Sequence, residues 1–202
     1  ILKNHTTPIS FLTYTSPKKY ERITTGNTKV YFAHFDMVQS EIMWQHNDAA
    51  TYNATNASAI SLFNEYFGGG MGSIVFQTIR ESKALAYSTN AYYSTPVKKT
   101  DPYTVSAYVG CQADKYNESI IAINELLHSM PQTDKLFQAS KDAIIQNIET
   151  QRTTKTAIFF NYDSNQKLGL TYDINKDLYA KIPTMTMNDL TAFFKLHIQE
   201  NS

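Results

Sequence analysis

The stretch that decides the fold runs from Tyr66 to Ser88 and reads Tyr-Phe-Gly-Gly-Gly-Met-Gly-Ser-Ile-Val-Phe-Gln-Thr-Ile-Arg-Glu-Ser-Lys-Ala-Leu-Ala-Tyr-Ser. Its triplet Gly68-Gly69-Gly70 predicts an elbow after a helix, because glycine adopts the left-handed conformation that helix ends use. A second short helix follows, with Arg80 at the edge of its apolar face beside Phe76. Tyr87 then begins a strand. A guanidinium and a phenol at such a junction can converge on one point and donate hydrogen bonds to a peptide carbonyl or carboxylate.

Outward from this stretch, the hydrophobic periodicity predicts strands before helices. Residues 28–35 and 38–45 alternate with a period of two, which is typical of strands with one face on a core. Asp48 is expected to cap a helix over residues 49–66. Further strands are expected at 86–94 and 103–111, and helices at 71–83, 114–129, 133–150, 154–167, 176–180 and 186–197. This order favours an α+β fold, an antiparallel-rich mixed sheet with helices packed on one face.

The composition is that of a folded globular domain without a strongly charged surface. Lys plus Arg and Asp plus Glu both number 18, so the formal net charge is zero, and no nucleic-acid partner is expected. No apolar run is long enough to span a bilayer, so no membrane insertion by this chain is expected. Cys111 is the lone cysteine, which excludes an internal disulfide. Its place in an apolar strand favours packing over nucleophilic catalysis.

No complete catalytic or metal-binding set is visible in the sequence. Zinc peptidases carry two closely spaced histidines on a helix, as in His-Glu-x-x-His or its inversion. The histidines here lie too far apart for either pattern: His5, His34, His46, His128 and His197. Gly72-Ser73 approaches a serine nucleophile elbow, but Val75 stands where that motif requires glycine. The glycine-rich run fails as a P-loop because it follows a helix and lacks the lysine before the serine, so a nucleotide site is a minor alternative.

The Tyr66–Ser88 stretch closely resembles the hallmark of the M16 metallopeptidase family, the group of pitrilysin, insulin-degrading enzyme and the mitochondrial processing peptidases. The glycine elbow, Phe-Gln-x-Ile-Arg-Glu and Leu-Ala-Tyr-Ser occur together at the family's spacing. The resemblance implies a LuxS/MPP-like M16 domain over residues 28–202, after a linker or lead-in segment at residues 1–27. The final strand of such a domain is expected after His197 and is missing, so the domain is expected to be truncated before its last strand.

Members of this family are built from two homologous halves that close like a clamshell. One half carries His-x-x-Glu-His, which binds zinc and supplies the base. The other lacks that motif and offers an Arg and a Tyr, seven residues apart, that hold the substrate backbone. Arg80 and Tyr87 match this spacing, so the chain resembles the non-zinc half. The resemblance implies no cofactor in this chain, a peptide substrate, and a zinc-bearing M16 half on the same polypeptide or a separate subunit.

Two functions follow from this resemblance and stay open. In the first, the chain is the substrate-binding half of a zinc peptidase and cleaves nothing when isolated. Gln39, Glu41 and Tyr108, on the more polar strand faces, are then expected to line the cavity, and the exposed sheet edge could add the substrate as a strand. In the second, the chain is a structural or assembly module, with Arg80 in a surface ion pair and Tyr87 a sheet residue. The resemblance to bacterial two-domain members suggests the cell envelope or periplasm of a bacterium.

Overall fold

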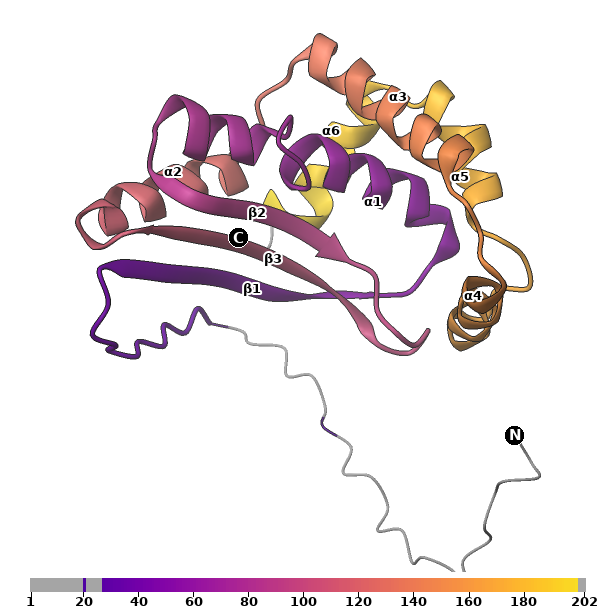
Figure 1. Cartoon of the computed structure of the whole chain (residues 1–202), viewed down its shortest axis with the longest axis horizontal. Helices are drawn as coiled ribbons and strands as arrows, with labels where there is room; N and C mark the ends of the chain where they lie inside the picture. The colour runs from indigo at the N-terminus through magenta and orange to yellow at the C-terminus, as the bar shows by residue number, and fades with distance from the viewer. Residues whose placement is uncertain (1–19, 21–26, 200–202) are drawn as a thin grey trace, which may run out of the picture.

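The strands of the described residues form one antiparallel sheet in the order β1-β3-β2 (Figure 1). The computed structural model describes residue 20 and residues 27–199 of the chain. The strands are β1 (Gln39–Thr51), β2 (Ala86–Ser94) and β3 (Pro102–Gln112). The α-helices are α1 (Ala57–Phe63), α2 (Tyr116–His128), α3 (Asp134–Thr150), α4 (Lys155–Leu168), α5 (Asn175–Lys181) and α6 (Met187–His197). Two π-helical segments, η3 (Asn64–Gly68) and η4 (Phe76–Ser82), flank the glycine elbow.

Alternation along the strands gives the sheet one covered face and one open face. In β1 the side chains of Ile42 and Trp44 are half-buried, whereas those of Glu41 and Met43 are exposed. Trp44 Nε1 donates a 3.0 Å hydrogen bond to the side chain of Asn124 on α2, which fixes that helix over the covered face. Beyond β1 no further strand is paired among the described residues, so β1 is an edge strand with a free outer edge.

Aromatic side chains from α1, η3 and α6 form the centre of the core. Phe63 stacks on Phe67 with ring centroids 5.0 Å apart. Phe193 and Phe194 pack on Phe63 at centroid distances of 5.6 and 6.4 Å. Each such buried ring contributes about 1.5–3 kcal/mol relative to exposure to water. Because Phe67 directly precedes Gly68, this packing also fixes the entrance to the glycine elbow.

A buried polar cluster joins β1 to β2 and α6. Asp48, predicted as a helix cap, instead lies within β1 and is 5% exposed. Its Oδ2 accepts a hydrogen bond from the Tyr93 hydroxyl at 2.6 Å and lies 2.6 Å from His197 Nδ1. Burial by itself raises the pKa of the Asp48 carboxyl, but hydrogen bonds from Tyr93 and from Ala50 N–H, together with His197, hold that pKa below its ordinary value. The cluster therefore favours a charged carboxylate in the core.

The α+β fold with helices on one face of an antiparallel sheet is confirmed. The structure differs from the sequence-based predictions mainly in the segments just before and after β1. Residues 28–35, predicted as a strand, are irregular and exposed, because alternation produces a strand only where a neighbour pairs with its backbone. The first helix begins at Ala57, after a turn in which the Asn53 side chain accepts from Thr55 N–H. The described sheet is wholly antiparallel, not mixed. The predicted lead-in at residues 1–27 lies almost entirely outside the described residues.

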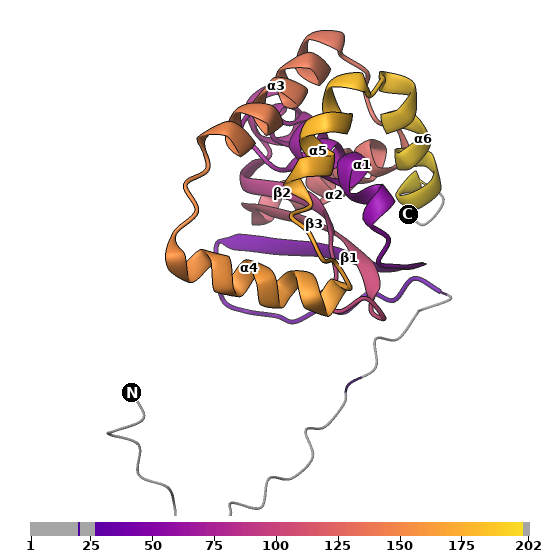
Figure 2. The ribbon, with the colours of Figure 1, turned by 90° about the vertical axis from the view of Figure 1, so that its right-hand side faces the viewer.

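Helix α4 lies apart from the helices that cover the sheet (Figure 2). The backbone contact that anchors it is a 3.1 Å hydrogen bond from Lys99 N–H, in the β2–β3 loop, to Lys167 O. None of its residues is buried, and its exposed apolar side chains are Ile158, Phe159, Phe160 and Tyr162. Over residues 27–199, no helix is long and apolar enough to cross a membrane.

Candidate functional site

The glycine elbow brings the end of η3 against β2 through close backbone contact. A Cβ atom on Gly68 would lie 1.9 Å from Ala91 O, and one on Gly69 would lie 2.7 Å from Asn64 O. Both positions therefore require glycine for space. The predicted left-handed conformation is wrong, since among described glycines only Gly169 has a positive φ. Gly70 meets nothing closer than 4.0 Å, so it is not required by packing.

Arg80 lies in the π-helical segment η4 with its guanidinium largely accessible. Its side chain is 46% exposed, and its Cζ lies 4.9 Å from the centroid of the Phe76 ring, as the sequence predicted. Arg80 Nε approaches a carboxylate oxygen of Glu81 at 3.9 Å. An exposed pair at that distance contributes well under about 1 kcal/mol. The guanidinium is therefore held over an aromatic ring while most of its donors are free to reach a ligand.

The chain between Arg80 and Tyr87 contains a residue in an unfavourable backbone conformation. Ala84 has φ of 49°, the left-handed region in which a side chain costs roughly 1–3 kcal/mol. Just before it, η4 is closed by the Lys83 N–H, which donates to Thr78 O at 3.0 Å. Short π-helical segments and strained residues concentrate at functional sites. Ala84 therefore adopts a backbone conformation that alanine does not favour by itself.

Tyr87 is the extra residue of a β-bulge at the start of β2. Ala86 pairs with Cys111 and Ser88 with Gly110, so Tyr87 has no partner on β3. A bulge changes the direction in which a side chain leaves the strand. The side chain of Tyr87, the extra residue, is 51% exposed. Its hydroxyl accepts a 2.6 Å hydrogen bond from the amide of Gln112, at the end of β3. The bulge therefore holds the phenol at this end of the open sheet face.

The open face carries the three further side chains predicted for the site. Gln39 pairs with Gln112, Glu41 with Gly110, and Tyr108 with Met43, so all three predicted residues point to the same side of the sheet. Burial raises the pKa of the Tyr108 phenol, and the nearby Glu41 carboxylate raises it further. Their role as the lining of a chamber with a second half stays a prediction.

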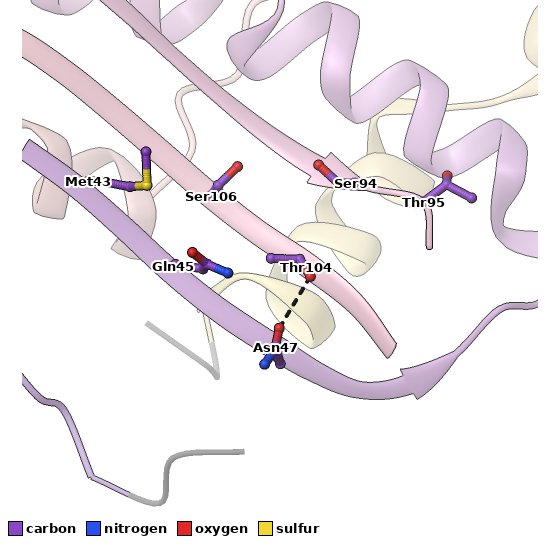
Figure 3. Close-up of a pocket in the computed structure, with 7 residues that line it drawn as sticks. All are labelled: Met43, Gln45, Asn47, Ser94, Thr95, Thr104 and Ser106. Carbon is purple, nitrogen blue, oxygen red and sulfur yellow. Dashed lines mark hydrogen bonds between the residues drawn. The ribbon is translucent and has the colours of Figure 1, made fainter. Parts of the chain in front are cut away.

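A cavity of about 620 Å³ lies on the open face at the opposite end of the strands (Figure 3). It is lined by Met43, Gln45 and Asn47 of β1, Thr104 and Ser106 of β3, Ser94 at the end of β2, and Thr95 just after it. The Thr104 hydroxyl donates a 3.2 Å hydrogen bond to the Asn47 side chain. None of these residues was predicted from the sequence to belong to a site. Extending the alternation of β1 and β3 past Glu41 and Tyr108 would have placed them on this face.

No cluster of three or more His, Cys, Asp or Glu side chains suited to a metal ion occurs within residues 27–199. His46, on β1, has a buried Nε2 atom without a hydrogen-bond partner, but no further ligand gathers beside it. The His197–Asp48 pair is satisfied within the core.

Comparison with known proteins bears directly on this arrangement. The sequence model of the family described as the peptidase M16 inactive domain matches residues 4–144, more than half of the chain. The chain belongs to this family. The glycine elbow, Arg80 and Tyr87 all lie inside the matched region. The recognition of the M16 family and of its non-zinc half from the Tyr66–Ser88 stretch is thereby confirmed.

Relatives of this M16 inactive domain include a protein described as a zinc protease and one described as a non-peptidase. Over 72 residues, 36% of the chain, it is 35% identical to an uncharacterized zinc protease of Mycobacterium leprae, with 16% of that protein covered. Over 190 residues, 93% of the chain, it is 25% identical to the non-peptidase homolog YmxG of Helicobacter pylori, with 41% of that protein covered. A crystal structure of a peptidase M16 inactive domain from Pseudomonas fluorescens shares the fold, with a TM-score of 0.68 and 17% identity over 81% of this chain and 39% of that one. The chain thus spans less than half the length of these proteins.

Proposed function

We propose that this M16 inactive domain is the substrate-binding half of a zinc peptidase, holding an extended peptide against a zinc site that a partner half supplies. The observation that carries the proposal is the backbone between Arg80 and Tyr87. A π-helical segment, the left-handed Ala84 and a β-bulge occur together there. Structural irregularities that cost free energy are retained where they position side chains for function.

The two side chains have complementary roles in this proposal. The Arg80 guanidinium offers several donors in a fixed planar arrangement and suits a peptide carbonyl or a terminal carboxylate. The Tyr87 phenol already accepts a hydrogen bond from Gln112, so its own O–H is available to donate to a second carbonyl. A substrate held by both groups would have its backbone fixed in direction. The outer edge of β1, which pairs with no other strand in the described part of the chain, offers a further place for an extended peptide to pair.

The partner half, the zinc and the peptide all belong to the proposal and not to this chain. The half carrying the zinc can lie on the same polypeptide or on another subunit, since the relatives are more than twice as long as their match to this chain. Proteolysis by the complex is proposed by analogy with the zinc protease of Mycobacterium leprae.

The alternative is a structural or assembly module of the same fold without a role in proteolysis. Its support is the relative in Helicobacter pylori, which is a non-peptidase homolog and matches 93% of the chain. A scaffold has no need for an exposed Arg and Tyr held on strained backbone. The two functions therefore differ in what they require of Arg80 and Tyr87.

The experiment is cleavage of an unstructured peptide by this chain mixed with its zinc-bearing half. Arg80→Ala and Tyr87→Phe are each expected to lower kcat/KM by roughly a hundredfold, about 2.7 kcal/mol of transition-state stabilisation, with folding intact. Arg152→Ala and Tyr162→Phe are matched controls, because both side chains are exposed and lie outside the site. Unchanged turnover in both site variants refutes the proposal and leaves the scaffold function. The chain alone is expected to cleave nothing.

A further inference from the structure

The cavity at the far end of the open face lies at a defined distance from Tyr87. Tyr87 is fixed to Gln112, at one end of β3, whereas the cavity is lined by Ser106 and Thr104 near the other end. The rise per residue of an antiparallel strand is about 3.4 Å, so the two sites are separated by roughly 20–27 Å along β3. An extended peptide covers that distance in roughly six to eight residues.

The two ends of the face differ in charge. Near Tyr87, the described side chains include Glu41 on the open face, and Arg80 and Glu81 on the adjoining η4. Around the cavity every lining side chain is uncharged (Figure 3). Besides the thioether of Met43, the lining consists of amides and hydroxyls: Gln45, Asn47, Ser94, Thr95, Thr104 and Ser106.

The amide and hydroxyl groups of the lining favour a ligand that is polar but uncharged. Amide and hydroxyl groups both donate and accept, so they match the backbone of an extended peptide and the side chains of Ser, Thr, Asn and Gln. A charged ligand side chain would meet no opposite charge among the lining residues, so the lining gives it no ion pair. Met43, 68% exposed at the rim, gives a flexible apolar contact that adapts to different side chains.

We propose that this cavity is a second peptide-binding subsite, which takes uncharged polar residues of the substrate six to eight positions away from the residue held at Tyr87. The inference rests on the proposed function, since it requires a peptide anchored by Arg80 and Tyr87. It adds that the substrate is a long, unstructured peptide with an uncharged polar segment. Two sites joined by one chain bind it more tightly than either alone, because the second contact becomes intramolecular.

Fluorescence anisotropy with the 202-residue chain tests the inference. The probes are labelled peptides of about four and about twelve residues composed of Ser, Asn, Gln and Ala, and twelve-residue versions with alternate residues replaced by Asp or by Lys. A four-residue peptide spans only about 14 Å and cannot reach both sites. The neutral long peptide is expected to bind at least tenfold more tightly than the short one and than either charged version.

Variants separate the two sites. Gln45→Ala combined with Ser106→Ala is expected to weaken the long peptide at least fivefold while leaving the short one unchanged, and Gln146→Ala on the exposed face of α3 is the matched control. Equal affinity for short and long peptides, or no effect of the cavity variant, overturns the inference. If Arg80→Ala and Tyr87→Phe weaken every peptide while the cavity variant changes nothing, the proposed function stands and the subsite does not. If only the cavity variant matters, the cavity binds peptide and the anchor at Tyr87 is wrong.

Discussion

Replacing Gly68 by alanine tests whether the elbow sets the position of β2. The added Cβ would lie 1.9 Å from Ala91 O, and ordinary contact begins near 3.4 Å, so β2 and the elbow must separate by about 1.5 Å. Two hydrogen bonds join the same elements, from Asn64 Nδ2 to Tyr93 O at 3.1 Å and from Tyr93 N to Asn64 Oδ1 at 2.8 Å. A separation of that size breaks both.

The expected loss is about 2–6 kcal/mol in the free energy of unfolding. Overpacking accounts for roughly 1–3 kcal/mol and each lost hydrogen bond for about 0.5–1.5 kcal/mol. That is a large fraction of the stability of an ordinary domain. Urea unfolding followed by Trp44 fluorescence and far-ultraviolet circular dichroism measures it. Gly72→Ala is the control, because a Cβ there meets nothing within 4 Å, and it is expected to change stability by less than about 0.5 kcal/mol. If Gly68→Ala is as stable as Gly72→Ala, the close approach of Gly68 to Ala91 O is wrong.

Two further predictions concern hydrogen bonds in the core. Because the pKa of Asp48 is lowered in the folded state, its stabilisation is present above the unfolded-state value, near pH 4, and is lost as pH falls through the lower folded-state value. In acid titrations of unfolding free energy, Asp48→Asn is therefore expected to flatten the loss of stability below about pH 4. It is also expected to cost about 1–3 kcal/mol at pH 7, because the charged acceptor that faces Tyr93 and His197 is lost; an unchanged acid profile contradicts the prediction. The Tyr66 hydroxyl donates to Pro131 O at 2.8 Å and accepts from Thr133 N–H at 2.9 Å, so Tyr66→Phe removes two hydrogen bonds of about 0.5–1.5 kcal/mol each and is expected to cost about 1–3 kcal/mol in urea unfolding. A cost below about 0.5 kcal/mol would show that water replaces the phenol.

The sequence predicts this fold well where the signal is local. The helix predicted at residues 186–197 is confirmed as α6, and its start is fixed by a capping box between Thr186 and Asp189, which lie only three residues apart. The strands on both sides of the β2–β3 loop are confirmed for the same reason, since alternation and turn residues are adjacent in the chain.

Features that depend on distant partners could not be predicted in this way. Asp48 resembles a helix cap in sequence, and only the meeting of β1 with β2 and α6 makes it a core carboxylate. The bulge at Tyr87 is defined by its register with β3, some twenty residues later in the chain. The left-handed Ala84 carries no sequence signal at all, because glycine or asparagine is the usual residue in that conformation. The motif identified Arg80 and Tyr87, but it did not predict the π-helical segment, the left-handed residue and the bulge that position them.

The contact between Asp48 and His197 joins positions 149 residues apart. During synthesis at about 5–20 residues per second, β1 leaves the ribosome roughly 7–30 seconds before α6 can reach it. Through that interval the Asp48 carboxylate can have Tyr93 and Ala50 as partners but lacks His197, so this end of β1 is not yet covered by α6. The domain therefore completes its core late. A chain that ended before α6 would leave the core face at the end of β1 exposed to solvent and to other proteins.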